Sequence, residues 1–211
     1  MKTAISLTLI AITATLLPGS WLELQRGGAL WRIATCHFTH FTYEQLAWDA
    51  LVFLFLAIAC ERRNRGAFQA TLLASVVIVP AAVLAFSNVM TYRGLSGIDS
   101  ALFGLLLVSE WRRNGIVAIC GVAFVAKMIF ELSTGATVFV HSDAFTVVPV
   151  AHIAGALVGV SVAVCRSGFV ARFVLRYRRL LRRLSGRNSE TPHTRRGFSG
   201  CSKSICFHST T

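Results

Sequence analysis

Charged side chains are scarce in this sequence of 211 residues. Only 14% of the residues are charged and 55% are hydrophobic, whereas about a quarter are charged in an average soluble protein. This shortage argues against a soluble domain and favours a membrane as the solvent of the chain. Because an apolar segment of about 20 residues crosses a bilayer, roughly six crossings fit into this length. No room is left for a large soluble domain.

The cysteines lack a recognisable pairing. The chain has six of them, none in a C-x-x-C motif, and most lie in or beside apolar runs. This spacing indicates neither a metal site nor a disulfide framework. We therefore expect no metal ion and no other cofactor.

Positive charge is concentrated near the C-terminus. The formal net charge is +12, and eight arginines lie between Arg166 and Arg187, after the last apolar run. Apolar residues recur there at helical spacing, and arginines occupy the positions between them. This pattern predicts a basic amphipathic juxtamembrane helix over residues 166–187. We expect it to bind anionic lipids rather than nucleic acid. Residues 188–211 show no periodicity and are predicted to form a disordered cytoplasmic tail.

Six apolar runs divide residues 1–165. This pattern predicts an all-α membrane protein with a bundle of six transmembrane helices. The first run follows Lys2 and is short, so a signal peptide is the alternative to a retained helix. The runs are Thr3–Leu17, Leu46–Cys60, Phe68–Val89, Gly94–Val108, Ile116–Leu132 and Phe145–Val164.

Lysine and arginine are unevenly distributed between the runs. Arg62, Arg63 and Arg65 follow the second run, Arg112 and Arg113 follow the fourth, and the arginine-rich segment follows the sixth. The breaks after the first and third runs together hold fewer lysines and arginines, and the break between the fifth and sixth runs holds none. Since positive loops stay inside, we expect both termini to be cytoplasmic and the fourth and sixth helices to begin at the outer side.

Ser96 and His152 are the candidate catalytic residues. Both helices that carry them begin at the outer side, so the two residues are predicted to lie at similar depth. A neighbouring imidazole can take the proton of a serine hydroxyl and make it a nucleophile. The alternative is a role in helix packing or a proton relay. We expect two small-residue stripes to bring the helices together: Ser96, Ser100 and Gly104 on one, and Ala151, Gly155, Gly159 and Ala163 on the other.

The motifs around these residues resemble those of the rhomboid intramembrane proteases. That family has a G-x-S-G serine opening the fourth helix and an H-x-x-G-x-x-x-G histidine in the sixth, and both motifs are complete here. Trp31-Arg32 is similar to the W-R loop element of the family, and C-H-F-T-H-F at residues 36–41 to its approach to the second helix. The resemblance covers roughly residues 31–164. It implies a serine-type endopeptidase that acts on transmembrane segments of other proteins.

The segment Y-R-G-L-S-G at residues 92–97 is most similar to the rhombosortase subfamily. These bacterial relatives process proteins with a C-terminal anchor that contains Gly-Gly, often with a histidine four residues after the serine, where this chain has Ser100. The resemblance implies C-terminal anchor segments as substrates. It also implies a bacterial inner (plasma) membrane location, and the distribution of arginines predicts an active site on the extracytoplasmic side of it.

Gln45, Asp49 and Gly94 are the candidate oxyanion- and substrate-binding residues. Rhomboids typically carry a histidine and an asparagine where this chain has Gln45 and Asp49. The Gln45 amide can donate a hydrogen bond, but an ionised Asp49 could only accept one and would oppose an oxyanion. We expect Asp49 to be protonated, because apolar surroundings disfavour the ionised form. The alternative is a catalytically inactive rhomboid-like protein that binds membrane clients.

Other polar residues are given structural roles. Lys127 and Glu131, four residues apart, are predicted to pair on one helix face. Asp99 is read as structural because a serine–histidine dyad needs no third acid, and His37 and His40 are expected to fix the outer loop. A small transporter that uses these residues is a further alternative, but the sequence shows no inverted repeat to support it.

Overall fold

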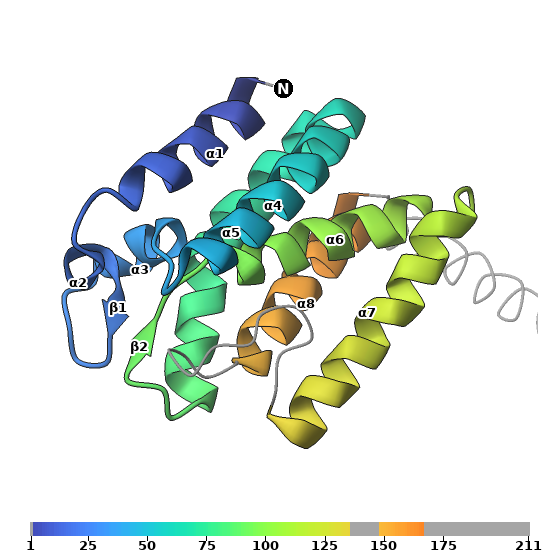
Figure 1. Ribbon diagram of the computed structural model, residues 1–211. Helices are drawn as coiled ribbons and strands as arrows, with labels where there is room; N and C mark the ends of the chain where they lie inside the picture. Colours follow the sequence, from blue (N-terminus) through green and yellow to red (C-terminus); the bar gives the residue numbers. More distant parts are fainter. Residues whose placement is uncertain (1, 136–147, 167–211) are drawn as a thin grey trace, which may run out of the picture. The chain divides into compact units, whose positions relative to one another are not determined.

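The structure, a computed structural model, describes residues 2–135 and 148–166. Six longer helices lie on the six apolar runs, as Figure 1 shows. The basic segment that follows Arg166 and the tail 188–211, for which the sequence predicts an amphipathic helix and disorder, lie outside the described residues. The six helices are α1 (Lys2–Ala14), α4 (Tyr43–Arg63), α5 (Arg65–Phe86), α6 (Ser96–Glu110), α7 (Gly115–Thr134) and α8 (Pro149–Arg166).

Four of the described helices are long and apolar enough to cross a membrane, namely α4, α5, α7 and α8. Helix α1 has 13 residues and α6 has 15. At about 1.5 Å per residue, α6 is about 22 Å long, which is less than the hydrocarbon thickness of about 30 Å. The chain is a helical integral membrane protein, and six complete spans stay a prediction.

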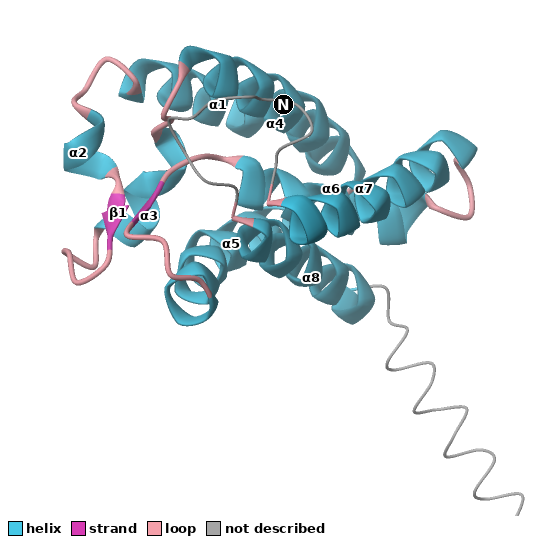
Figure 2. Ribbon diagram, turned by 60° about the horizontal axis from the view of Figure 1, so that its bottom comes forward, coloured by secondary structure: helices cyan, strands magenta, loops and turns pink. Residues whose placement is uncertain are grey.

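Short elements connect α1 to α4 and α5 to α6. Between α1 and α4 lie α2 (Gly19–Leu22), β1 (Leu24–Gln25), α3 (Arg32–Thr35) and the 3-10 helix η1 (Cys36–Phe38). Strand β1 pairs antiparallel with β2 (Thr91–Tyr92), just before α6. Figure 2 shows the two strands in magenta, side by side. The hydropathy pattern does not predict these elements.

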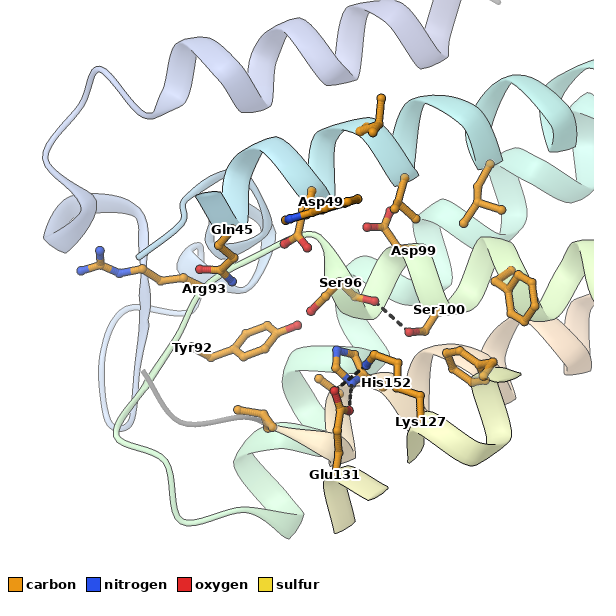
Figure 3. A pocket seen from close by; sticks show the side chains of 18 of the residues that line it. Gln45, Asp49, Tyr92, Arg93, Ser96, Asp99, Ser100, Lys127, Glu131 and His152 are labelled. Carbon is orange, nitrogen blue, oxygen red and sulfur yellow. Dashed lines mark hydrogen bonds and ion pairs between the residues drawn. The ribbon is translucent and has the colours of Figure 1, made fainter. Parts of the chain in front are cut away.

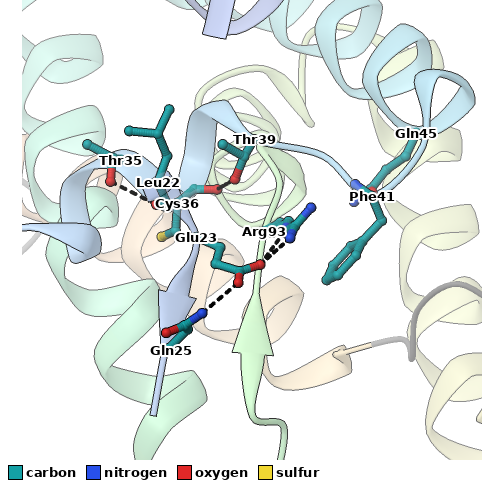
Figure 4. Close-up of polar contacts among 9 residues, drawn as sticks. All are labelled: Leu22, Glu23, Gln25, Thr35, Cys36, Thr39, Phe41, Gln45 and Arg93. Carbon is teal, nitrogen blue, oxygen red and sulfur yellow. Dashed lines mark hydrogen bonds and ion pairs between the residues drawn. The ribbon is translucent and has the colours of Figure 1, made fainter. Parts of the chain in front are cut away.

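A partly buried ion pair secures this strand pair. The Glu23 side chain binds Arg93 and accepts a hydrogen bond from Gln25 Nε2 at 2.7 Å, as drawn in Figure 4. Arg93 also lies over the Phe41 ring, 4.7 Å from its centroid. The loop after α1 therefore holds the chain segment that enters α6.

His37 joins the same loop to α5. Pro80 lies inside α5 and has no backbone N–H, so the carbonyl of Val76, four residues earlier, lacks its helical donor. The fully buried His37 donates from Nε2 to that carbonyl at 3.2 Å. A buried carbonyl without a hydrogen bond is costly, so His37 offsets a defect that Pro80 creates.

Helices α6 and α8 touch through their backbones. A Cβ atom added at Gly155 would lie 1.9 Å from the Gly97 carbonyl oxygen, and one at Gly159 would lie 1.8 Å from that of Ala101. One added at Gly104 would lie 2.5 Å from the backbone oxygen of Ala156. Any side chain at these positions would force the two helices apart.

The predicted stripe is confirmed on α8 and needs a correction on α6. Ala151, Gly155, Gly159 and Ala163 are all buried. On α6 the contact face consists of Gly97, Ala101 and Gly104, so Ser96 and Ser100 are not part of it. Small residues occupy both adjacent stripes of this helix, and the two serines instead line a pocket beside the contact.

Helix α7 is the least buried of the four candidate spans. Its buried residues are Gly121, Met128 and Glu131. It contacts α6 through the rings of Phe124 and Phe103, whose centroids are 5.2 Å apart. The outward side of α7 is exposed and apolar, as expected for a helix that faces lipid.

The Gly155→Ala variant should be less stable than the wild type, because its new methyl group has no space between α8 and α6. Overpacking of this kind costs about 1–3 kcal/mol, so the thermal midpoint in detergent should fall. Gly115→Ala is the matched control, since nothing lies within 4 Å of the added atom. Equal midpoints for the two variants would contradict the backbone contact.

His37 should make stability depend on pH. Burial, only partly offset by the hydrogen bond to Val76, lowers the pKa of His37 from 6.5 to about 4. As pH falls below 6.5 the unfolded chain binds a proton at this residue, whereas the folded chain does not until about 4. The contribution of His37 to the free energy of unfolding is therefore complete above pH 6.5. It should fall by about 3 kcal/mol in total as the pH decreases from 6.5 to about 4.

Thermal unfolding at neutral pH and at about pH 4.5 measures this loss. The His37→Gln variant keeps an N–H donor for Val76 but cannot titrate, so its midpoint should fall less over the same interval. An equal decrease in the variant and the wild type would assign the pH dependence to other groups.

Candidate functional site

Ser96 is the first residue of α6 and is half-buried. The preceding Leu95 provides no side-chain cap for the N–H groups of the first helical turn. Gly94 has a left-handed φ of 119°, and its N–H donates to the Cys36 carbonyl at 3.1 Å. The serine hydroxyl thus lies at a helix N-terminus, where negative charge is stabilised.

The Gln45 amide points toward this turn. Its Oε1 accepts a hydrogen bond from the Phe41 N–H at 3.0 Å, which leaves Nε2 as the outward donor. A Cβ atom at Gly94 would lie 2.8 Å from Gln45 Nε2 and 3.2 Å from Asp49 Oδ2. Gly94 therefore serves two needs, a left-handed backbone and space for the two α4 side chains.

Asp49 has an imidazole partner. His40 Nε2 lies 3.3 Å from Asp49 Oδ2, and the His40 side chain is 1% exposed. His40 is therefore more than a loop anchor, because it also contacts a candidate site residue. The predicted protonation of Asp49 stays a prediction.

His152 lies in the first turn of α8 and contacts α7. Its Nδ1 is 3.1 Å from Glu131 Oε2. The other oxygen, Glu131 Oε1, accepts a hydrogen bond from Lys127 Nζ at 2.6 Å, which confirms the predicted pairing within α7. Among the described residues, no hydrogen bond joins the imidazole to the Ser96 hydroxyl.

A single pocket of about 1040 Å³ gathers these groups. Figure 3 shows Gln45 and Asp49 from α4, Ser96 from α6 and His152 from α8 around it. Gly94 does not line the pocket itself but lies close to the ends of the Gln45 and Asp49 side chains. The wall of the pocket is largely apolar and comes from α4 and α7: Trp48, Leu51, Val52, Phe55, Phe124 and Phe130.

Two neighbouring groups stay neutral. Burial raises the pKa of the Cys36 thiol to about 12, with smaller opposing effects of backbone hydrogen bonds, so this cysteine does not compete as a nucleophile. Burial raises the pKa of the Tyr92 phenol well above its ordinary value. In the described part of the chain, no group of three His, Cys, Asp or Glu residues could hold a metal ion.

A Rhomboid domain matches residues 27–169 of the sequence. The chain belongs to the rhomboid family. Rhomboid proteins are generally intramembrane serine proteases that act on transmembrane substrates, and the family includes inactive homologues. No curated protein matches the chain significantly. The rhomboid match includes every residue of the pocket and leaves out α1, α2 and β1.

One contact in the site of this rhomboid protein does not follow from the sequence pattern. Helical spacing predicts that Lys127 and Glu131 pair, but it does not connect Glu131 with His152. The two residues lie on different helices, 21 positions apart, so helical periodicity gives no signal for their contact. A carboxylate at the depth of a candidate base was the available clue, since ionisable groups are rare in membrane helices.

Proposed function

We propose that this chain is an intramembrane serine endopeptidase that cleaves transmembrane or C-terminal anchor segments of other membrane proteins. The observation that carries the proposal is the pocket that Ser96, His152 and Gln45 share. It combines a nucleophile, a base and a hydrogen-bond donor, which are the parts that acyl transfer requires. No cofactor takes part in the proposed reaction.

The proposed reaction begins when His152 removes the proton of Ser96 Oγ, which attacks the scissile carbonyl carbon. The Gln45 amide and the backbone N–H of Ser96 donate hydrogen bonds to the oxyanion that forms. His152 then returns the proton to the leaving nitrogen, and an acyl-enzyme results. Water, deprotonated by His152, releases the acid and restores the serine.

Depth and lining favour a membrane-embedded substrate. Arg112 and Arg113 follow the end of α6 and should lie at one surface of the membrane. A helix of about 22 Å that starts at this surface leaves Ser96 about 8 Å below the opposite surface of a hydrocarbon layer of about 30 Å. The apolar walls of α4 and α7 suit the side chains of a transmembrane segment. The substrate must unwind locally, because a helix protects its own backbone carbonyls.

Location and partners follow from charge. We propose that both termini are cytoplasmic, that the pocket opens toward the extracytoplasmic side of a bacterial inner membrane, and that the basic segment 166–187 binds anionic lipids. The rhombosortase subfamily is the one we favour for this chain. The Tyr92-Arg93 start of its serine motif supports that choice, and Ser100 departs from it.

A catalytically inactive protein that binds membrane clients is the second candidate function. One observation favours it, and a second is compatible with it. Asp49 occupies the place where an oxyanion donor is needed, and Ser96 is not hydrogen-bonded to His152 among the described residues. In active sites without substrate such hydrogen bonds are often long, so the second observation alone does not decide between the candidates.

Labelling of the purified protein with a fluorophosphonate separates the two functions. The wild type should be labelled, and Ser96→Ala should not, because the probe bonds to the activated serine oxygen. His152→Ala should still fold but should lose both labelling and cleavage of a transmembrane test substrate. An unlabelled wild type would favour the client-binding protein.

Substitutions of Asp49 test its role as an oxyanion donor. Asp49→Asn keeps a donor beside Gly94, whereas Asp49→Ala removes it, at a typical cost of about 10²–10³ in rate. The asparagine variant should therefore retain most of the cleavage rate and the alanine variant should lose most of it. If the two variants cleave equally well, Gln45 and the Ser96 N–H suffice without Asp49.

A further inference from the structure

We propose that Glu131 is a positioning residue for His152 and that Lys127 keeps Glu131 ionised. This inference rests on the proposed protease function. It adds an acidic third member to a pair that would otherwise act as a simple dyad. The contacts that carry it are drawn as dashed lines in Figure 3.

Each oxygen of the Glu131 carboxylate has one partner. Oε2 lies 3.1 Å from His152 Nδ1, and Oε1 accepts from Lys127 Nζ at 2.6 Å. The Glu131 side chain is 1% exposed, against 19% for Lys127 and 13% for His152. The carboxylate is therefore the buried centre of a chain of three ionisable groups.

The lysine decides the protonation state of the carboxylate. An unpaired charge is costly in a membrane interior, but an ammonium group within hydrogen-bond distance offsets much of this cost. An ionised carboxylate has no proton and can only accept hydrogen bonds. The hydrogen between His152 and Glu131 must then belong to Nδ1 of the imidazole.

This tautomer is the one that catalysis needs. With Nδ1 protonated, the lone pair of His152 is on Nε2, where it can take the Ser96 proton. After that transfer the imidazole carries both protons and one positive charge, next to the Glu131 carboxylate. The carboxylate stabilises this charge and stays ionised throughout.

Other titratable groups around the imidazole do not replace Glu131. His152 lines the pocket, and the elements that surround the pocket in the described structure contribute several titratable groups to its lining. Of these groups, Glu131 is the one that hydrogen-bonds the imidazole. The others are Asp49 on α4, Tyr92 and Arg93 at β2, Asp99 on α6, and Cys120 and Lys127 on α7.

The test measures the rate of fluorophosphonate labelling of Ser96 against pH in the full-length protein. Glu131→Gln can present its amide N–H to Nδ1 and so favour the wrong tautomer, and labelling should slow by about 10²-fold or more. The acid limb of the profile should also move to lower pH, because the imidazolium loses its counter-charge. A packing role alone would not move this limb.

Glu110→Gln is the matched control. Glu110 is another carboxylate in an ion pair, with Arg63, and it is not among the residues that line the pocket. Its labelling rate and pH profile should equal those of the wild type. Glu131→Asp, which keeps the charge, should recover part of the rate lost in Glu131→Gln.

Nitrogen NMR of His152 gives a second readout on the unaltered protein, in case Glu131→Gln does not fold. The wild type should show a proton on Nδ1 at neutral pH, and a proton on Nε2 instead would overturn the inference. A wild type that is labelled, with an identical profile in Glu131→Gln, would overturn the inference and leave the protease function intact. A wild type that is not labelled would overturn both.

Discussion

The direct backbone contact between α6 and α8 is the constraint on which the site depends. Gly155 and Gly159 lack the Cβ atoms that would keep the helices apart, so carbonyl oxygens of α6 lie against α8. This closeness brings the start of α6 and the first turn of α8 to one pocket. Ser96 and His152 can share that pocket because neither of them lies within the contact itself.

Polar groups in the site are held by contacts between elements. The Gln45 amide is oriented by the backbone of Phe41, Asp49 lies against His40, and Glu131 joins Lys127 to His152. In an apolar medium each of these groups would be costly without a partner. The partners also fix the orientation of the side chains before any substrate arrives, which is what an efficient acyl-transfer site requires.

Features that follow helical periodicity could be predicted from the sequence. The six apolar runs correspond to helices, the small-residue stripe of α8 is buried as expected, and Lys127 pairs with Glu131. The α6 face was misassigned because Ser96, Gly97, Ser100 and Ala101 offer two equally small stripes. Only the partner helix decides which of them is used.

Features that depend on contacts between distant segments could not be predicted. The strand pair of β1 and β2 has two residues per strand, too short for an alternation pattern. The contact of Glu131 with His152 depends on how α7 is placed beside α8, which no local pattern encodes. Hydropathy shows that each helix exists, but the positions of the helices come from packing.

The hydrogen bond between His37 and Val76 has a consequence for the evolution of this chain. Pro80 removes a donor from α5 and His37, 39 positions before Val76, supplies another. Loss of the histidine alone leaves a carbonyl without a donor, and loss of the proline alone leaves a buried imidazole competing with a restored helical N–H. The two positions therefore constrain each other's substitutions, although one lies in a loop and the other inside a helix.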